Sequence, residues 1–211
     1  YIALLGWAPD SEQEIYTLQE LIEIFDIKRI SKSPAIFDIN KLTWMNGMYL
    51  RAMSLEEFHD LALPYYEGVI QSNVDLEAVS KILQQRVEIL TQIPEMIDFI
   101  DTLPEYDNAM YIHKKMKTTY EIALTALKAS EKALGELDDW SSEEAVHEVL
   151  LALPAQLEMK NGQVLWPVRT AVSGKQFTPG GAIEIAHILG KEETLKRIAV
   201  GIKKLEAEIN A

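Results

Sequence analysis

A short stretch near the carboxyl end of the sequence carries residue types that could hold a ligand through backbone groups. Residues 172–193 read VSGKQFTPGGAIEIAHILGKEE, in which Gly180 and Gly181 stand directly before an apolar-periodic segment. A helix that begins there would leave unpaired N–H groups and the positive end of its dipole facing outward. Glycine would also let a flat group approach the backbone closely. The stretch therefore predicts either an ordinary connector between two helices or a cradle for an unstacked base.

The side chains around this loop supply the other groups that a bound base would need. Hydroxyl and backbone groups can bond the edge of a base, whereas cationic side chains can meet its phosphates. Pro179 stiffens the loop and offers a flat apolar face. The remaining candidates are Arg169 on the preceding helix and Lys175, Gln176 and Thr178 in the loop. These residues alone do not exclude that the loop only connects two helices.

Three Glu-x-x-His patterns indicate a second kind of chemistry, a metal site inside a helical bundle. Residues at i and i+3 share one face of a helix, and two such pairs with two further glutamates can hold a di-iron centre. The pairs are Glu56–His59, Glu144–His147 and Glu184–His187. The first two glutamates fall in first turns of predicted helices, where a carboxylate already favours the helix dipole. We keep the metal site as an alternative and assign no metal ligand.

The sequence offers no pattern for catalysis by this chain. A Gly-x-Ser-x-Gly elbow is absent, and the lack of Cys excludes a thiol nucleophile. Residues 173–181 contain the letters of a phosphate-binding loop in the wrong order, with no predicted strand before them. Ser31-Lys32-Ser33 matches the end of an ATP-binding KMSKS loop, but Ser33 before Pro34 predicts a helix N-cap followed by proline. We therefore assign no catalytic residue.

The composition is that of a soluble globular protein. The chain has 211 residues, 48% hydrophobic and 25% charged, which predict one large or two small domains. No apolar run reaches about 18 residues, so we expect no membrane span. The absence of Cys excludes disulfides and fits a reducing, cytoplasmic setting.

The distribution of charge is more informative than its total. The net charge of −13 argues against a nucleic-acid partner, because phosphates require a basic face. Residues 160–204, however, contain 8 Lys and Arg against 3 Asp and Glu, whereas residues 1–140 contain 12 against 24. The candidate loop lies within this basic segment, so the sequence stays compatible with a nucleic-acid partner there.

Helix signals dominate the sequence and predict an all-α fold. Capping patterns mark helix starts at Thr17, Ser54 and Ser141, and Asn40 can cap a further helix. One stripe of five apolar residues follows the period of a helix. Its members are Leu76, Val79, Leu83, Val87 and Leu90.

The carboxyl-terminal half predicts a succession of helices that divides the chain into three units. The expected spans are 106–136, 142–160 with an interruption at Pro154, 164–172, a helix ending at Gly190, and 191–209. Asn161-Gly162 predicts a turn between two of them. We expect a short helix and loop segment over 1–60, followed by two helical bundles over 61–140 and 141–211.

Three motifs together indicate a family. Leu4–Trp7 reads LLGW, Ser31–Arg51 reads SKSPAIFDINKLTWMNGMYLR, and Gly174–Ile198 reads GKQFTPGGAIEIAHILGKEETLKRI. Over nearly its whole length the chain resembles the C-terminal portion of bacterial glutamyl-tRNA synthetases. The resemblance implies the end of a stem-contact segment at 1–60 and two helical anticodon-binding subdomains after it. It also implies a parent enzyme that ligates glutamate to tRNA with ATP and Mg2+, and whose catalytic domain is missing from this chain.

The resemblance also implies which residues bind tRNA. In relatives, an arginine of the first bundle meets the third anticodon base, and the matching position here is Arg86. The other two bases meet an arginine on a proline-bearing helix and a Thr-Pro-Gly turn. The implied tRNA-binding residues are Arg86, Arg169, Lys175, Gln176, Thr178, Pro179 and Gly180. From the residues alone, Arg86 is equally an arginine that extends from the edge of the core into solvent.

The implied partner of this chain is the anticodon arm of glutamate tRNA. Its phosphates would meet the basic segment 160–204, together with the cations Lys28, Arg29, Lys114, Lys115 and Lys117. Because most of the chain is acidic, we expect weak binding with a strong dependence on salt. An amidotransferase is a candidate protein partner, and no DNA or membrane partner is expected. A helical protein–protein adaptor with an acidic binding face stays a further alternative.

Overall fold

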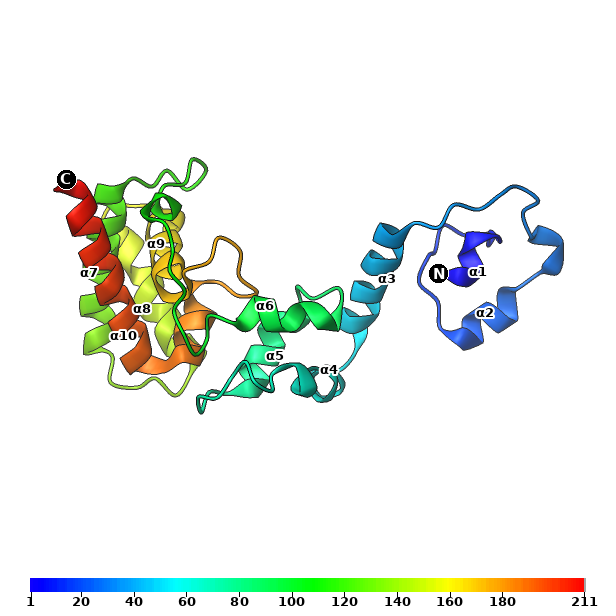
Figure 1. The fold of residues 1–211 in the computed structure, drawn as a ribbon, viewed down its shortest axis with the longest axis horizontal. Helices are drawn as coiled ribbons and strands as arrows, with labels where there is room; N and C mark the ends of the chain where they lie inside the picture. The colour runs from blue at the N-terminus through cyan, green and yellow to red at the C-terminus, as the bar shows by residue number, and fades with distance from the viewer. Residues whose placement is uncertain (211) are drawn as a thin grey trace.

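The chain folds into helices and loops arranged along one long axis (Figure 1). The computed structural model describes residues 1–210, and within that range two isolated bridges are the only β pairings. The elements are α1 (Ile2–Leu5), α2 (Leu18–Ile24), η1 (Ile27–Arg29), α3 (Ile39–Ala52), α4 (Leu55–Ala62), η2 (Leu63–Tyr65), α5 (Leu76–Gln84), η3 (Leu90–Gln92), α6 (Ile93–Ile97), η4 (Asn108–Tyr111), α7 (Tyr120–Glu136), α8 (Glu143–Gln156), α9 (Asn161–Ser173) and α10 (Ala182–Ile209). The all-α prediction is therefore confirmed. Among these residues, no helix combines the length and the apolar character that a bilayer span requires.

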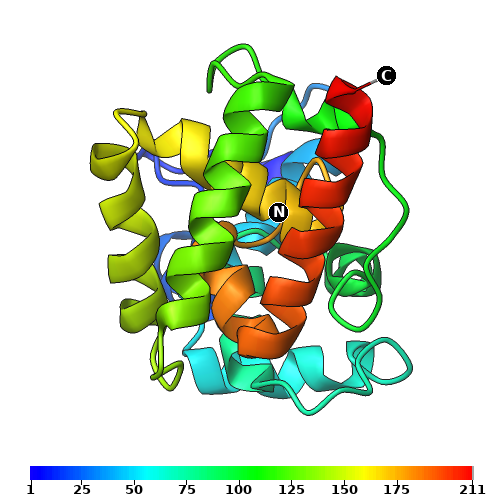
Figure 2. The same ribbon diagram turned by 90° about the vertical axis from the view of Figure 1, so that its left-hand side faces the viewer.

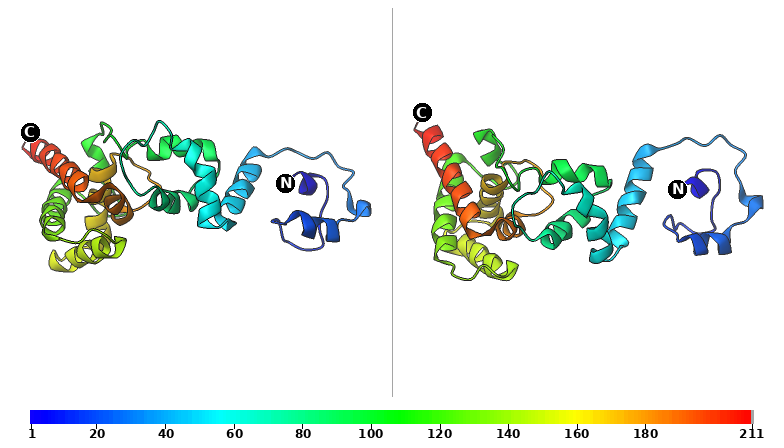
Figure 3. Two further views of the ribbon diagram at one scale, coloured as in Figure 1. Left: turned by 90° about the horizontal axis from the view of Figure 1, so that it is seen from below. Right: turned by 60° about the horizontal axis from the view of Figure 1, so that its bottom comes forward.

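Three groups of elements follow one another along the long axis (Figures 1 and 3). The segment with α1 and α2 lies at one end, and α3 connects it to α4, α5 and α6 in the middle. Helices α7 to α10 form a bundle at the other end, in which α10 packs against both α7 and α9 (Figure 2). The predicted units 61–140 and 141–211 stay a prediction. The packing of α7 with the C-terminal bundle favours a boundary before Tyr120.

The five apolar residues predicted as one helical stripe all pack in the middle group, but α5 ends at Gln84, so Val87 and Leu90 lie beyond that helix. Val79, Leu83 and Val87 are completely buried, and Leu76 and Leu90 pack against the same core. Each such side chain contributes about 1.5–3 kcal/mol through its removal from water. Leu83 and Val87 are buried on either side of the turn after α5. They therefore fix the backbone of Arg86, whose side chain is exposed between them.

Two of the predicted helix starts are confirmed. The Thr17 hydroxyl accepts the backbone N–H of Glu20, and the Glu20 carboxylate accepts the backbone N–H of Thr17. Ser54 and Glu57 form the same reciprocal pair at the start of α4. These capping boxes satisfy backbone donors that the helix itself cannot pair.

The other predicted caps are wrong. Ser142 rather than Ser141 caps α8, because its hydroxyl reaches the N–H of the third helical residue. The Asp38 carboxylate accepts two N–H groups at the start of α3, and Asn40 lies inside that helix. Ser33 caps no helix, since the chain is irregular from residue 31 to residue 38. A shift of one or two residues in the first turn changes the capping side chain without changing the helix.

Helix α7 is shorter than the predicted span 106–136. It begins at Tyr120, and residues 112–118 form a loop instead. His113 and Thr118 form an isolated bridge across this loop, in which the Thr118 hydroxyl accepts the His113 backbone N–H at 2.8 Å. The apolar residues before Tyr120 pack against the core although the chain there forms no α-helix. Their helix-like spacing therefore led to a wrong prediction.

The connection between α8 and α9 also differs from the prediction. Helix α8 continues through Pro154 without interruption and ends at Gln156. Asn161 and Gly162 form the first turn of α9 rather than a separate turn. The side-chain oxygen of Gln163 accepts the Lys160 backbone N–H at 2.9 Å, which helps to start the helix one turn earlier than expected.

Helix α10 consists of two segments that meet at Gly190, as the sequence predicts. The backbone there has φ 74° and ψ 172°, a conformation that glycine alone adopts readily. The first segment begins at the candidate loop, and the second packs along the C-terminal bundle.

We predict that Gly190→Ala lowers the free energy of unfolding by about 1–3 kcal/mol, because alanine would be strained at this φ. Crowding is not the cause, since a Cβ at Gly190 would have no neighbour within 4 Å. Gly135→Ala in α7 is the matched control, because its Cβ is equally unobstructed and its backbone is helical. It should be neutral or stabilise by about 1 kcal/mol or less. Urea unfolding measures both, and equal stability of the two variants would contradict the strain at Gly190.

Candidate functional site

The candidate loop, residues 174–181, is fixed at both ends by the helices that it joins. Helix α9 ends at Ser173, and Gly174 has a left-handed φ of 61° while its N–H donates to Thr170 O at 2.8 Å. Helix α10 begins directly after Gly181, which occupies the N-cap position and has no side chain to cap it. The expected glycine pair ahead of a helix is therefore confirmed.

Arg169 holds the loop in place through its guanidinium. Nη1 donates to Thr178 Oγ1 at 3.3 Å and Nη2 donates to Gln176 O at 2.9 Å. The guanidinium also lies over the Trp166 ring, 4.4 Å from its centroid. Thr178 in turn donates to Gly180 O at 2.7 Å. Burial lowers the pKa of Arg169 from its usual range.

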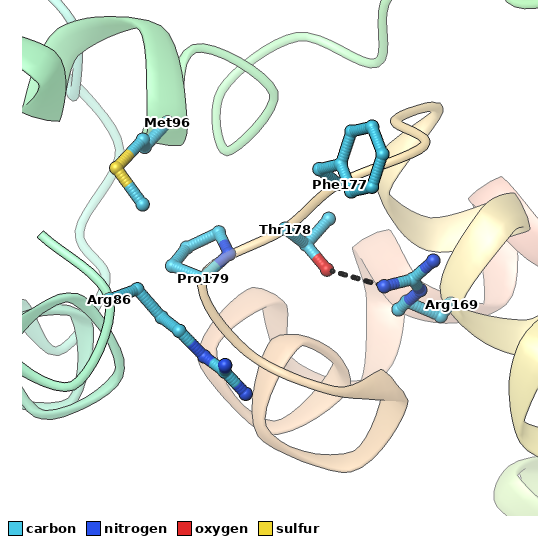
Figure 4. A pocket seen from close by; sticks show the side chains of 6 residues that line it. All are labelled: Arg86, Met96, Arg169, Phe177, Thr178 and Pro179. Carbon is cyan, nitrogen blue, oxygen red and sulfur yellow. Dashed lines mark hydrogen bonds between the residues drawn. The ribbon is translucent and has the colours of Figure 1, made fainter.

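The loop borders an open cavity of about 400 Å³ between the middle group of helices and the C-terminal bundle (Figure 4). The lining residues are Arg86, Met96, Arg169, Phe177, Thr178 and Pro179. Arg86 and Met96 lie on one side of Pro179, and Thr178 and Arg169 lie on the other. Two arginines that are far apart in the sequence therefore line one pocket from opposite sides.

Arg86 differs from Arg169 in being unconstrained. It lies in the turn after α5, between buried Leu83 and Val87, and its side chain is exposed. Within residues 1–210 its guanidinium has no hydrogen-bond or ion-pair partner. Arg86 thus presents five N–H donors to the pocket in a planar fork.

Two apolar residues of the pocket are absent from the prediction. Phe177 is 83% exposed at the loop, and Met96 extends from α6. An exposed phenylalanine in a loop of otherwise polar and small residues is the signal that sequence reasoning could have used. These two side chains offer flat or soft apolar surfaces on which a base can stack, whereas Pro179 lines the pocket but is itself buried.

The other predicted loop residues lie around the pocket rather than in it. The Lys175 ammonium pairs with Asp98 at 2.7 Å, which places the lysine against the end of α6. Gln176 contributes its carbonyl to Arg169, and its side chain is exposed. Gly180 lines a neighbouring cavity of about 510 Å³ that Arg86 and Pro179 also border. A Cβ at Gly180 would lie 3.2 Å from Ile82, so the glycine allows close packing there.

A third cavity lies on the far side of Arg169. It measures about 380 Å³, and Arg169, Trp166 and Met116 are among its lining residues. The Trp166 indole N–H donates to Met110 O at 2.8 Å, which fixes the ring. The predicted cations Lys114, Lys115 and Lys117 flank Met116 on the exposed loop 112–118. They are therefore sequence neighbours of a residue that shares this cavity with Arg169, although they do not line the cavity themselves.

The basic segment 160–204 presents less positive charge than its composition indicates. Several of its cations already have acidic partners within the described chain. The pairs are Lys175–Asp98, Lys196–Glu193, Arg197–Glu193 and, at 4.0 Å, Lys204–Glu105. Counting charges along the sequence could not separate these paired cations from those that face solvent.

The metal-site alternative gains no support from the structure. Among residues 1–210, no group of three or more His, Asp or Glu side chains could hold a metal ion. Glu144 and His147 are 3.7 Å apart on the surface of α8, whereas His59 bonds to the Ser80 hydroxyl at 2.8 Å. The three Glu-x-x-His patterns are thus dispersed among different helices.

Comparison with known proteins places this geometry in a family context. The family model described as an anticodon binding domain matches residues 57–202. The glutamate–tRNA ligase of Clostridium tetani is 58% identical over 210 residues, which are 100% of this chain and 43% of the relative. The glutamate–tRNA ligase of Clostridium acetobutylicum is 52% identical over 98% of this chain and 42% of its own length. The chain therefore spans about two fifths of the curated relatives that it matches.

A solved structure agrees with these sequence relatives. The crystal structure of a glutamate tRNA ligase from Elizabethkingia meningosepticum, in complex with its amino acid, has a TM-score of 0.76 to this chain. It is 27% identical and is matched over 97% of this chain and 40% of its own length.

We predict that Arg169→Ala increases amide hydrogen exchange at residues 176–178, because the guanidinium supplies the side-chain bonds to Gln176 and Thr178. The loss in global stability should stay near 1–3 kcal/mol, the range for a charged hydrogen-bond donor. Arg86→Ala is the control, since Arg86 bonds to neither residue. Hydrogen exchange followed by mass spectrometry separates the variants. Unchanged exchange in Arg169→Ala would show that the loop is held by other contacts.

Proposed function

The chain belongs to the anticodon-binding domain family whose model matches residues 57–202, and from this premise we propose that it binds the anticodon arm of glutamate tRNA. The ligation itself belongs to the remainder of the parent enzyme. The proposal rests on one pocket. Arg86 from the middle group of helices and Arg169 from the C-terminal bundle both line it, together with the exposed Phe177. Such a pocket supplies both stacking surfaces and directional donors, which together read an unstacked base.

Arg86 is proposed to read the third anticodon base. Codons for glutamate begin with guanine, so this base is cytosine, whose pairing edge presents two acceptors, O2 and N3. On the same edge guanine presents two N–H donors and a single acceptor, O6, so a guanidinium placed for two neighbouring acceptors would lose one bond and face a donor. Arg86 therefore favours glutamate tRNA over a tRNA with guanine there, such as glutamine tRNA.

The loop is proposed to receive the other two bases. Arg169, Lys175, Gln176, Thr178, Pro179 and Gly180 are the proposed contacts. Because Arg169 and Thr178 hold the loop before any RNA binds, little conformational entropy remains to be lost on binding. Pro179 is buried and lines two of the cavities, so its proposed part is to shape both of them rather than to lie between bases.

Phosphates are proposed to meet the cations around the pocket rather than the body of the protein. Lys114, Lys115 and Lys117 lie on the exposed loop beside the third cavity. Most of the remaining surface is acidic, since the net charge is −13. We therefore expect modest affinity that falls steeply with salt.

The wider activity is proposed from the relatives alone. In the parent, ATP and Mg2+ would act in the part that this chain does not contain, and the work would take place in the cytoplasm. An amidotransferase is a proposed protein partner of the parent. No residue of this chain is proposed as catalytic.

We predict that Arg86→Ala reduces discrimination between two anticodon stem-loops that differ only by cytosine or guanine at the third position. The loss should be about 1–3 kcal/mol, the value of a good bidentate contact to a base. Fluorescence anisotropy titration of both labelled RNAs measures it. Thr91→Ala, an exposed position on η3 that lines neither of the two cavities bordered by Arg86, is the control and should keep the wild-type ratio. Equal affinity of the wild-type chain for both RNAs would refute base reading.

A phosphate contact should behave differently from a base contact. We predict that Lys115→Ala weakens both stem-loops by the same factor and lowers the slope of log Kd against log salt by about one. Lys128→Ala is the matched control on α7, because its ammonium already pairs with Glu206 at 2.6 Å. If the salt slope of Lys115→Ala equals that of the wild type, the proposed contact between the loop 112–118 and the RNA phosphates is wrong.

A further inference from the structure

Arg197 is the most deeply buried charged side chain among residues 1–210, with 1% of its surface exposed. Each of the three guanidinium nitrogens nevertheless has a partner, and four of the five N–H groups are used. Nη1 donates to Phe99 O at 2.8 Å and to Val172 O at 2.7 Å, and Nη2 donates to Ile100 O at 2.7 Å. Nε pairs with Glu193 at 2.7 Å, one turn earlier on α10. A charge at this depth is tolerated only when it is paired with an opposite charge and hydrogen-bonded.

The three carbonyl groups belong to both walls of the pocket. Phe99 and Ile100 follow directly after α6, the helix that carries Met96. Val172 lies in the last turn of α9, the helix that carries Arg169. Carbonyl groups at the ends of helices lack partners within the helix, and a cation there also complements the helix dipole. One guanidinium thus joins the carboxyl ends of two helices from opposite sides of the site.

We propose that Arg197 is a positioning residue that sets the spacing between Arg86 and Met96 on one wall and Arg169 with the loop on the other. Its hydrogen bonds and its ion pair involve no lining residue of the pocket, and it acts through the two helix ends that it joins. The inference rests on the proposed function, because the spacing matters for base discrimination. Lys175 and Asp98 link the same two walls, but this pair is partly exposed and therefore weaker.

The planar fork of arginine is what this joint requires. A guanidinium can direct separate N–H groups at three carbonyl oxygens and a carboxylate at once. A lysine ammonium in its place keeps the charge and the pairing with Glu193, but it is a compact point with three donors and cannot reproduce the fork. Arg197→Lys should therefore loosen the spacing while it preserves the buried ion pair.

The test compares the two stem-loops with cytosine or guanine at the third anticodon position. We expect Arg197→Lys to lower the ratio of their affinities by about tenfold, a large part of what one good base contact supplies. Lys196→Met is the matched control, because Lys196 is 70% exposed and pairs with the same Glu193 but bonds to no carbonyl. It should keep the wild-type ratio. A wild-type ratio in folded Arg197→Lys would overturn the proposal.

A second measurement records the spacing without RNA. The sequence contains no cysteine, so spin labels can be placed on Glu95→Cys in α6 and Asn161→Cys in α9 without background. We expect the distance distribution to broaden in Arg197→Lys and to stay narrow in Lys196→Met. A narrow distribution in Arg197→Lys would also overturn the proposal. Arg197→Met removes every donor, and if it does not fold, Arg197→Lys alone carries the test.

The two measurements separate failure of this inference from failure of the proposed function. If the wild-type chain does not distinguish the two RNAs, the anticodon reading fails, and the role of Arg197 in it fails with it. If the wild-type chain distinguishes them and Arg197→Lys does so equally well, only the positioning role fails.

Discussion

A pocket whose walls belong to different groups of helices exists only while those groups keep a fixed spacing. Arg86 and Met96 come from the chain around α5 and α6, whereas Arg169 and Phe177 come from α9 and the loop that follows it. Neither group carries enough of the site to read a base alone. The spacing is held in the interior, where the guanidinium of Arg197 bonds to carbonyl oxygens at the ends of α6 and α9. Bonds of this kind are stronger and less sensitive to salt than ion pairs at the surface.

The two arginines of the pocket play different physical parts. Arg169 bonds to the loop through Nη1 and Nη2 and lies over the Trp166 ring, so it builds the shape of the site. Arg86 has no such partner within the described chain, and its donors are available to a ligand. One arginine thus holds the loop and the other is the one that we propose to read a base, although both carry the same charge.

The acidic character of the chain is consistent with selective RNA binding. A protein with a net charge of −13 repels phosphates over most of its surface, so RNA that binds non-specifically gains little. In the proposed function, binding would then depend on local cations such as those of the loop 112–118 and on contacts to bases. The acidic surface would lower the affinity for any RNA. A larger share of the binding free energy would then depend on the identity of the bases.

The sequence by itself determined the properties that depend on neighbours along the chain. The all-α class, the part of the stripe that lies on α5, the capping boxes at Thr17 and Ser54 and the break at Gly190 all follow from local spacing and backbone preference. The resemblance additionally named Arg86, Arg169 and the Thr178 turn, and the structure brings them to one pocket.

Only the tertiary structure decided which side chains are buried and which charges are paired. Arg197 counts as a surface cation in the sequence, yet it bonds to Ile100, 97 residues away. Lys175 reads as a phosphate contact, yet Asp98 pairs with it. Met96 and Trp166 enter the site through packing that no local pattern encodes. The physical reason is that burial and pairing are set by segments remote in sequence, whereas helix formation is set within a few residues.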